Sequence, residues 1–218
     1  LYNVASEVER YALLHPEKAA LVIVSEDEKE EILTYEQLRI YMNKLVNAFL
    51  SCGIACYDKV LVLVPRGIEA YGIYLALIKM GAVVIPGSEM LRGKDIAYRA
   101  NHAEAKAIIA TKELLSEIDD IREECESLTW FISVGEHRKG WQELTDILVG
   151  VAEEAESVET GSDERAFLSY TSGTTGGPKG VMHVHGWPFA HLAVAATYWL
   201  DVQENDLVWA TASPGWAK

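Results

Sequence analysis

Val60-Leu-Val-Leu-Val64 is a continuous run of β-branched residues and leucine that ends at Pro65. A strand that is buried on both faces has this composition, because neither of its faces meets water. Apolar residues then recur with helical spacing over 68–80, and a second apolar run follows over 82–85. This succession of strand, helix and strand predicts a parallel βαβ unit.

The same alternation continues after this unit. The apolar patterns predict strands over 107–110 and 130–134, and helices over 94–101, 112–126 and 141–149. Repeated strand–helix units of this kind form parallel sheets covered by helices. We therefore predict an α/β fold with mainly parallel sheets flanked by helices.

The N-terminal part carries two further signals. An apolar run over 21–24 is followed by a charged stretch over 25–31, which predicts a hairpin or a strand edge. Thr34 and Gln37 stand at the spacing of a capping box, and the helical apolar period that follows stops at Gly53. A helix with both ends marked is expected between them.

Composition changes once along the chain, over 151–164, which is acidic and poor in large apolar residues. Such a segment is typical of an exposed connection. We expect a first α/β subdomain over 1–150, the acidic connection over 151–164, and a glycine-rich loop with the start of a second subdomain over 165–218.

The charge balance excludes some partners. The chain has 218 residues, with 19 Lys and Arg against 33 Asp and Glu, which gives a formal net charge of -14. Such a field repels polyanions, so no nucleic-acid partner is expected. No apolar run approaches the ~20 residues of a membrane span, and the N-terminus is not a basic signal sequence. The three cysteines do not stand at metal-ligand spacing and are expected to be reduced structural thiols. We therefore expect a cytoplasmic protein with no membrane span.

A glycine-rich loop over 171–180 carries the chemistry. Strands are predicted on both sides of it, over 166–170 and 181–184. Glycines let backbone N–H groups converge on phosphate oxygens, hydroxyl groups add donors, and a lysine adds positive charge. The residues of these three kinds are Gly173, Gly176, Gly177 and Gly180, then Thr171, Ser172, Thr174 and Thr175, and finally Lys179. The loop is therefore expected to bind a polyphosphate rather than to be only a polar turn.

Two other phosphate motifs do not fit this loop. Counted from Gly173, the places that a P-loop gives to Gly-Lys-Ser/Thr hold Pro178, Lys179 and Gly180, so the hydroxyl that binds Mg²⁺ is missing. A strand rather than a helix is predicted after the loop, so a kinase-like phosphotransferase is disfavoured. No GxGxxG occurs either, which removes the main signal for a dinucleotide-binding fold.

Two histidines, His183 and His185, follow the loop two residues apart. They lack a third ligand at a suitable spacing, which favours satisfied core or surface histidines over a metal site. We expect no protein metal ligand.

The run Tyr170-Thr-Ser-Gly-Thr-Thr-Gly-Gly-Pro-Lys-Gly-Val181 resembles the signature of adenylate-forming (AMP-binding) enzymes, which include acyl-CoA synthetases, adenylation domains and luciferases. The stretches 81–88, 95–99 and 211–218 resemble the medium-chain and acetyl-CoA synthetase branch. The resemblance implies the partial N-terminal domain of such an enzyme.

The same resemblance implies a two-step reaction. A carboxylate attacks the α-phosphate of Mg²⁺-bound ATP to give an acyl-adenylate and pyrophosphate, and the thiol of CoA then displaces AMP. ATP, Mg²⁺ and CoA are the implied cofactors, and a short- or medium-chain fatty acid is the implied substrate. Lys179 would stabilise the developing phosphate charge as the catalytic residue, and Trp216 and Ala217 would line the acyl pocket. The residues implied to hold the phosphates are Thr171, Ser172, Gly173, Thr174, Thr175, Gly176, Gly177 and Lys179.

Several parts of the family's site are not found in the sequence. The family completes the site with a Tyr-Gly-x-Thr-Glu stretch, a Gly-Asp pair at the ribose and a catalytic lysine from a C-terminal domain. We therefore expect an N-terminal fragment that is inactive alone, from a parent acid–thiol ligase of fatty acid metabolism. The alternative is a non-catalytic nucleotide-binding or interaction module.

Overall fold

The computed structural model describes residues 1–25, 27–171, 177–209, 212 and 215. Its large sheet consists of β3 (Lys59–Leu63), β4 (Val83–Pro86), β5 (Ala107–Thr111), β6 (Trp130–Val134), β7 (Gln142–Glu143), β8 (Arg165–Thr171) and β9 (Lys179–Val184). The α-helices are α1 (Val4–Leu14), α2 (Tyr35–Ser51), α3 (Ile68–Lys79), α4 (Gly93–Ala103), α5 (Leu115–Asp120), α6 (Leu144–Ile147) and α7 (Gly186–His191), and a π-helix, η3 (Leu192–Trp199), follows α7.

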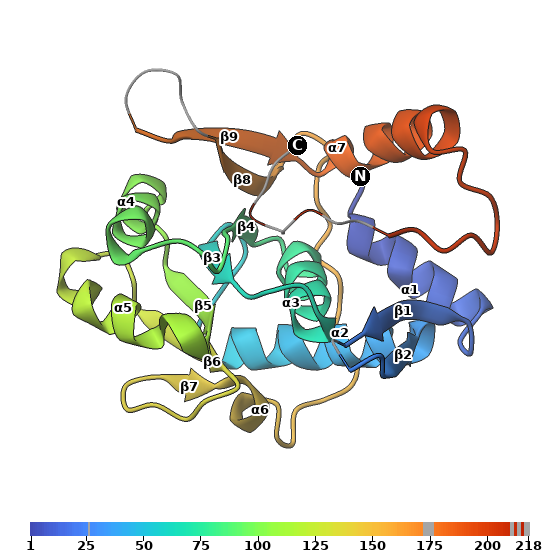
Figure 1. Cartoon of the computed structure of the whole chain (residues 1–218). Coiled ribbons are helices and arrows are strands. Elements are labelled where there is room, and N and C mark those ends of the chain that lie inside the picture. The colour runs from blue at the N-terminus through green and yellow to red at the C-terminus, as the bar shows by residue number, and fades with distance from the viewer. Residues whose placement is uncertain (26, 172–176, 210–211, 213–214, 216–218) are drawn as a thin grey trace.

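The order of the strands confirms the predicted fold class. Within the described residues, the sheet has the order β7-β6-β5-β3-β4-β8-β9. All neighbours run parallel except β8 and β9. Helices lie against the sheet, as Figure 1 shows, so the fold is α/β with a mainly parallel sheet flanked by helices.

The central strand β3 lies between two hydrophobic cores, as its composition predicts. Val60 and Val62 belong to the core that contains α2 and α3. Leu61 and Leu63 alternate with them and belong to the core that contains α4 and α5. Because successive side chains of a strand point to opposite faces, a continuous apolar run serves both cores.

The N-terminal predictions are also confirmed. The strands β1 (Ala19–Val24) and β2 (Glu30–Thr34) form an antiparallel hairpin around the charged turn. The backbone N–H of Gln37 donates to the Thr34 hydroxyl at 3.2 Å, and the Gln37 side chain accepts from the Thr34 N–H at 2.8 Å. This reciprocal capping box begins α2.

The acidic stretch over 112–126 is not the single helix that its pattern predicts. It divides into a 3-10 turn (η1, Lys112–Leu114), the short α5, and a second 3-10 turn (η2, Arg122–Glu124). Asp119 and Asp120 stand four residues before Glu123 and Glu124. Like charges at that spacing repel each other on a helix, so this repulsion opposes an extension of α5.

The prediction of a helix over 141–149 is also wrong before Leu144. Gln142 and Glu143 pair with Ile132 and Ser133 of β6 as the edge strand β7. The Glu143 carboxylate then accepts from the Thr145 N–H at 2.6 Å, which caps α6. The N-cap therefore delays the start of the helix to Leu144.

Residues 151–164 contain no described helix or strand, but side chains of α2 hold their backbone. The Asn43 amide donates to the Glu153 carbonyl at 2.9 Å, and the Asn47 amide donates to the carbonyls of Ala152 and Glu154 at the same distance. After this segment, β8 joins the sheet beside β4. The division into two subdomains stays a prediction.

A buried lysine ties three helices to this connecting segment. The Lys79 side chain on α3 is fully buried, and its ammonium donates to Asn43 Oδ1 on α2 at 2.6 Å and to the Glu9 carboxylate on α1. The Ser157 hydroxyl donates to the other Glu9 oxygen at 2.8 Å. The backbone joins as well, since the Val158 N–H donates to the Lys79 carbonyl at 3.0 Å.

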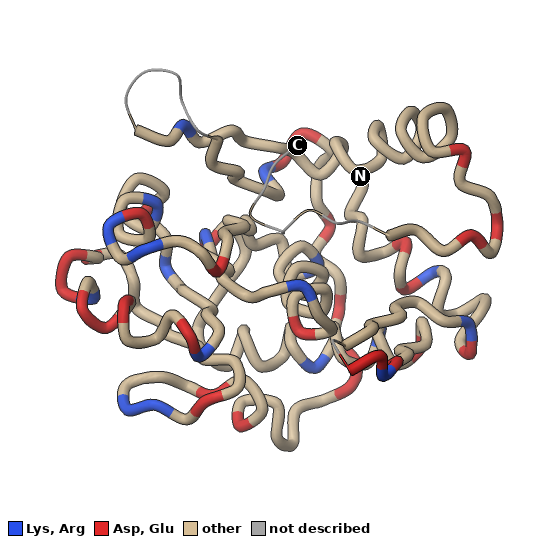
Figure 2. The backbone as a smooth tube through the Cα atoms, in the orientation of Figure 1, with Lys and Arg blue, Asp and Glu red and all other residues tan. Residues whose placement is uncertain are grey.

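Charged residues of both signs are distributed around the molecule, as Figure 2 shows. No helix in the described part of the chain is long and apolar enough to cross a membrane.

Candidate functional site

The glycine-rich segment joins β8 and β9, which form an antiparallel hairpin at one edge of the sheet. Thr171 pairs with Lys179, and Tyr170 pairs with Gly180. The strands are therefore longer than predicted, since β8 extends to Thr171 and β9 begins at Lys179. A strand, β9, follows the loop, as predicted, whereas a helix follows a P-loop.

The predicted phosphate-binding residues divide into two groups. Thr171 ends β8 and is half-buried, while Gly177 and Lys179 are exposed at the other side of the loop. Lys179 is the only Lys, Arg, Asp or Glu from Thr171 to Val184. Thr171 and Lys179 are thus brought together across the ladder. The other predicted site residues lie outside the described residues: Ser172, Gly173, Thr174, Thr175, Gly176, Trp216 and Ala217.

Helix α4 supports the described end of this loop. The Tyr98 hydroxyl donates to the Pro178 carbonyl at 2.9 Å. A Cβ atom added to Gly177 would lie 3.2 Å from that hydroxyl oxygen, closer than side chains usually pack. Glycine therefore lets the loop pass directly over the Tyr98 ring.

Tyr170, at the base of the hairpin, lies in a cluster of aromatic and charged side chains from α4. Its hydroxyl is 2.8 Å from His102 Nδ1, and the Arg99 guanidinium lies over its ring at 5.5 Å from the centroid. The Tyr98 and His102 rings stack with their centroids 5.6 Å apart. Burial, together with the nearby Tyr98, raises the pKa of Tyr170 to about 12, so its hydroxyl stays protonated as a donor at neutral pH.

The sequence prediction missed Tyr98 and His102. They are four residues apart on α4, which extends beyond the predicted helix over 94–101 and places them on one helix face, but nothing in the sequence shows that this face meets the loop. The contact depends on the parallel pairing of β4 with β8, which brings segments about 80 residues apart together.

Gly215 lies against the loop after β4. A Cβ atom added to Gly215 would be 2.2 Å from Ser88 N and 2.4 Å from the Gly87 carbonyl carbon. Glycine is the only residue that fits such a close backbone contact. Gly215, which belongs to one stretch of the narrower resemblance, therefore meets Gly87 and Ser88, which belong to another.

The histidines after the loop differ in their surroundings. The His183 ring packs on Trp187, with centroids 4.6 Å apart. His185 is buried, and neither ring nitrogen has a hydrogen-bond partner among the described residues, so the prediction of a satisfied histidine is wrong there. Burial lowers the pKa of His185, although the nearby Glu164 carboxylate opposes the shift.

Acid should therefore destabilise the protein through His185. Its pKa in the folded protein lies below the ordinary 6.5, so between that value and the folded pKa the unfolded chain binds more protons. The free energy of unfolding should fall as the pH is lowered through this window. Urea unfolding at about pH 7.5 and about pH 5.5 measures the loss. His185→Gln should show a smaller loss, and an equal loss in both proteins would contradict the prediction.

Known proteins are similar to this chain over most or all of its length. A family model described as "AMP-binding enzyme" matches residues 8–217. YtcI, an uncharacterised acyl-CoA ligase of Bacillus subtilis, is 46% identical over 217 residues, which are 100% of this chain and 40% of that protein. The mitochondrial acyl-coenzyme A synthetase ACSM4 of Mus musculus is 35% identical over 205 residues, 93% of this chain and 35% of that protein. The chain thus spans less than half the length of these relatives.

Solved structures have a similar fold over nearly the whole of this chain. An acyl-CoA synthetase of Brucella canis superposes with a TM-score of 0.88 at 26% identity, over 99% of this chain and 39% of that one. The anthranilate CoA ligase AuaEII, whose crystal structure contains anthranoyl-AMP, has a TM-score of 0.84 at 24% identity, over 90% and 37% of the two chains. This second likeness concerns the fold alone.

Proposed function

Because this chain belongs to the AMP-binding enzyme family, we propose that the intact protein activates a carboxylic acid with ATP and transfers the acyl group to CoA. The acid becomes an acyl-adenylate with release of pyrophosphate, and the CoA thiol then displaces AMP. The relatives named as acyl-CoA ligases and synthetases support this reaction class.

The pairing of Thr171 with Lys179 supports particular residues of the loop as the phosphate site. The ladder ends with Thr171 beside Lys179, so a hydroxyl and an exposed ammonium flank a loop rich in glycine and hydroxyl residues. Lys179 meets no acidic neighbour along the hairpin, and its charge is not neutralised by a residue between Thr171 and Val184. Such a site suits the terminal phosphates of ATP.

Lys179 would act on the leaving group. When the carboxylate attacks the α-phosphorus, negative charge develops on the departing pyrophosphate, and a fixed ammonium beside it lowers the barrier. The hydroxyl groups of Thr171, Ser172, Thr174 and Thr175 and the N–H groups of Gly173, Gly176 and Gly177 would hold the phosphate oxygens. Mg²⁺ would enter with ATP and neutralise part of its charge.

Helix α4 would fix the position of the loop relative to the sheet. The Tyr98 hydroxyl holds the Pro178 carbonyl, one residue before the proposed catalytic lysine. At the other strand, His102 contacts the hydroxyl of Tyr170. The flanks of the phosphate loop are therefore held from the same helix face, which favours a preorganised charge at Lys179.

The acyl pocket is proposed to begin where Gly215 passes Gly87 and Ser88. Trp216 and Ala217, which follow directly in the sequence, stay the proposed lining residues. A short- or medium-chain fatty acid is the proposed substrate. Three free thiols, Cys52, Cys56 and Cys125, agree with a cytoplasmic location.

The nature of the nucleotide products tests the proposal. The intact protein, given ATP, Mg²⁺, CoA and a panel of acids from acetate to decanoate, is expected to form AMP, pyrophosphate and an acyl-CoA. Omission of the acid is the control and should abolish AMP formation. Formation of ADP and phosphate would contradict the proposal. Binding of ATP without any acid-dependent turnover would favour the non-catalytic nucleotide-binding module instead.

A further inference from the structure

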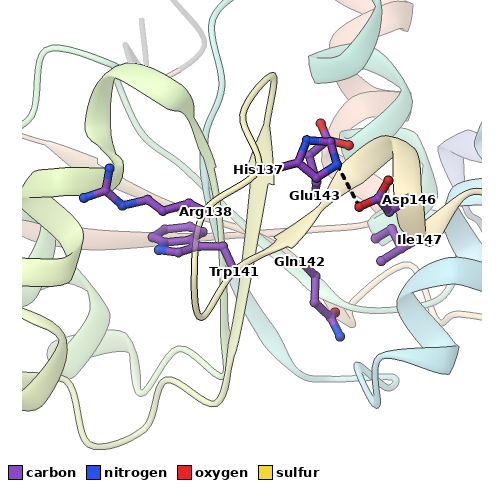
Figure 3. A pocket seen from close by; sticks show the side chains of 7 residues that line it. All are labelled: His137, Arg138, Trp141, Gln142, Glu143, Asp146 and Ile147. Atoms are coloured by element: carbon purple, nitrogen blue, oxygen red, sulfur yellow. Dashed lines mark ion pairs between the residues drawn. The ribbon is translucent and has the colours of Figure 1, made fainter.

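A second group of chemically active side chains lies at the opposite edge of the sheet from the phosphate loop. His137 lies in the turn between β6 and β7, Glu143 ends β7, and Asp146 is on α6. One ligand atom from each lies within 4.8 Å of the others. Figure 3 shows these three side chains gathered on one side of a small pocket of about 340 Å³.

Glu143 is the fixed member of the group. It is buried, with 5% of its surface exposed, and its carboxylate accepts from the N–H groups of Gly135 at 3.2 Å and Thr145 at 2.6 Å and from the Thr145 hydroxyl. Burial by itself would raise the pKa of Glu143, but these hydrogen bonds outweigh burial and hold the pKa below its usual value. A charged carboxylate is thus held in place by neighbouring donors, as the ligands of metal sites usually are.

His137 and Asp146 are the adjustable members. His137 Nε2 lies 3.0 Å from Asp146 Oδ2, and both side chains are largely exposed. Two donors bound to one tetrahedral Zn²⁺ at about 2.0–2.2 Å are about 3.4 Å apart, so a separation of up to 4.8 Å here must close by as much as about 1.4 Å. Exposed side chains make such a change without disturbing the core.

The basic residue of the same pocket does not compete for these ligands. The Arg138 guanidinium donates to Asp119 at 2.6 Å and lies near Glu136 at 3.6 Å. Trp141 also donates to Asp119, at 2.8 Å. In Figure 3 the Arg138 and Trp141 side chains lie away from the three ligand residues. The three candidate ligands therefore lie on one side of the pocket. Arg138, the basic residue among those that line the pocket, lies on the other side.

We propose that His137, Glu143 and Asp146 form a binding site for a divalent transition-metal ion such as Zn²⁺. One imidazole nitrogen and two carboxylate oxygens are ligands that Zn²⁺ accepts, and three protein ligands leave a fourth position for water. A bound ion would join the turn after β6 to α6 and so stabilise this edge of the sheet. The alternative is an exposed His–Asp ion pair, which by itself contributes little.

No protein metal ligand is predicted from the sequence, because neither the cysteines nor the histidines after the loop stand at a metal-ligand spacing. His137, Glu143 and Asp146 are separated by six and three residues and lie on a turn, a strand and a helix. They meet only because β7 pairs with β6 at the edge of the sheet. The site does not depend on the proposed enzymatic function.

Zinc titration of the purified, chelator-treated protein tests the proposal. Isothermal titration calorimetry should show one Zn²⁺ bound, and both His137→Ala and Asp146→Asn should weaken that binding about tenfold or more. His15→Ala removes an exposed histidine elsewhere and should leave the affinity unchanged. The two test substitutions are at exposed positions, so they should spare the fold, which far-UV circular dichroism checks.

A second measurement separates a specific site from general attraction to an acidic protein. Zn²⁺ should raise the thermal unfolding midpoint of the wild type and of His15→Ala more than that of His137→Ala, because an ion bound only to the folded state stabilises it. The proposal is overturned if the wild type binds no Zn²⁺, or if His137→Ala and Asp146→Asn bind it as tightly as the wild type. Equal weakening by His15→Ala would overturn it too.

Discussion

Lys179→Ala in the intact enzyme is expected to slow acyl-adenylate formation by roughly 100- to 1,000-fold, the usual effect of removing one preorganised group that stabilises transition-state charge. The proposed role predicts that the loss appears mainly in kcat for adenylation, because the charge on pyrophosphate grows as the bond breaks. Acid-dependent exchange of labelled pyrophosphate into ATP measures this step without the thioester step. Transfer from a preformed acyl-adenylate to CoA should be much less affected.

Two controls make this result specific. Lys139→Ala removes an exposed lysine at the other edge of the sheet and should leave exchange unchanged. Lys179 is exposed, so its replacement should lower the free energy of unfolding by no more than about 0.5 kcal/mol. Unchanged pyrophosphate exchange in Lys179→Ala would refute the role of this residue.

Lys79→Ala should cause the largest loss of stability, about 3–5 kcal/mol, because it leaves charged and polar partners of a buried ion pair without their cation. Glu9 is about three-quarters buried and Asn43 is fully buried, so neither gains full compensation from water. Urea unfolding of the two proteins measures the difference in the free energy of unfolding.

The matched control is Lys29→Ala, which breaks an ion pair with Asp27 on the surface. The Lys29 side chain is 82% exposed, and such pairs contribute about 0–1 kcal/mol. The contrast between the two lysines tests whether burial, rather than the presence of an ion pair, sets the loss. A loss below about 1 kcal/mol in Lys79→Ala would show that the buried network is not important for stability.

The sequence predicts most of the fold because local patterns and packing agree. The apolar run Val60–Val64 can be satisfied only by two cores, and the Thr34 capping box marks its helix without any tertiary contact. The prediction fails where a local pattern competes with charge or pairing. α5 is shorter than predicted, where repulsion between acidic residues opposes an extension, and Gln142 and Glu143 pair with β6 as a strand.

The candidate sites also contain contacts that local sequence patterns do not predict. The residue types of the phosphate loop are visible in one continuous stretch, so the loop could be predicted from sequence. From α4, Tyr98 contacts the loop at Pro178 and His102 contacts Tyr170 on the strand before the loop, and the candidate metal ligands come from a turn, a strand and a helix. Contacts of this kind depend on which strands become neighbours, and a single sequence does not encode that order in any local pattern.

The buried network around Lys79 also bears on how the chain folds during synthesis. Ser157, which completes the hydrogen bonds of Glu9, is made roughly 80 residues after Lys79. At a synthesis rate of 5–20 residues per second, Ser157 is added about 4–16 s after Lys79, so the Lys79–Glu9 pair lacks this hydroxyl during that time. Helix α1 should therefore dock late, and a nascent chain stopped before residue 157 should leave it more open to proteases than the finished one.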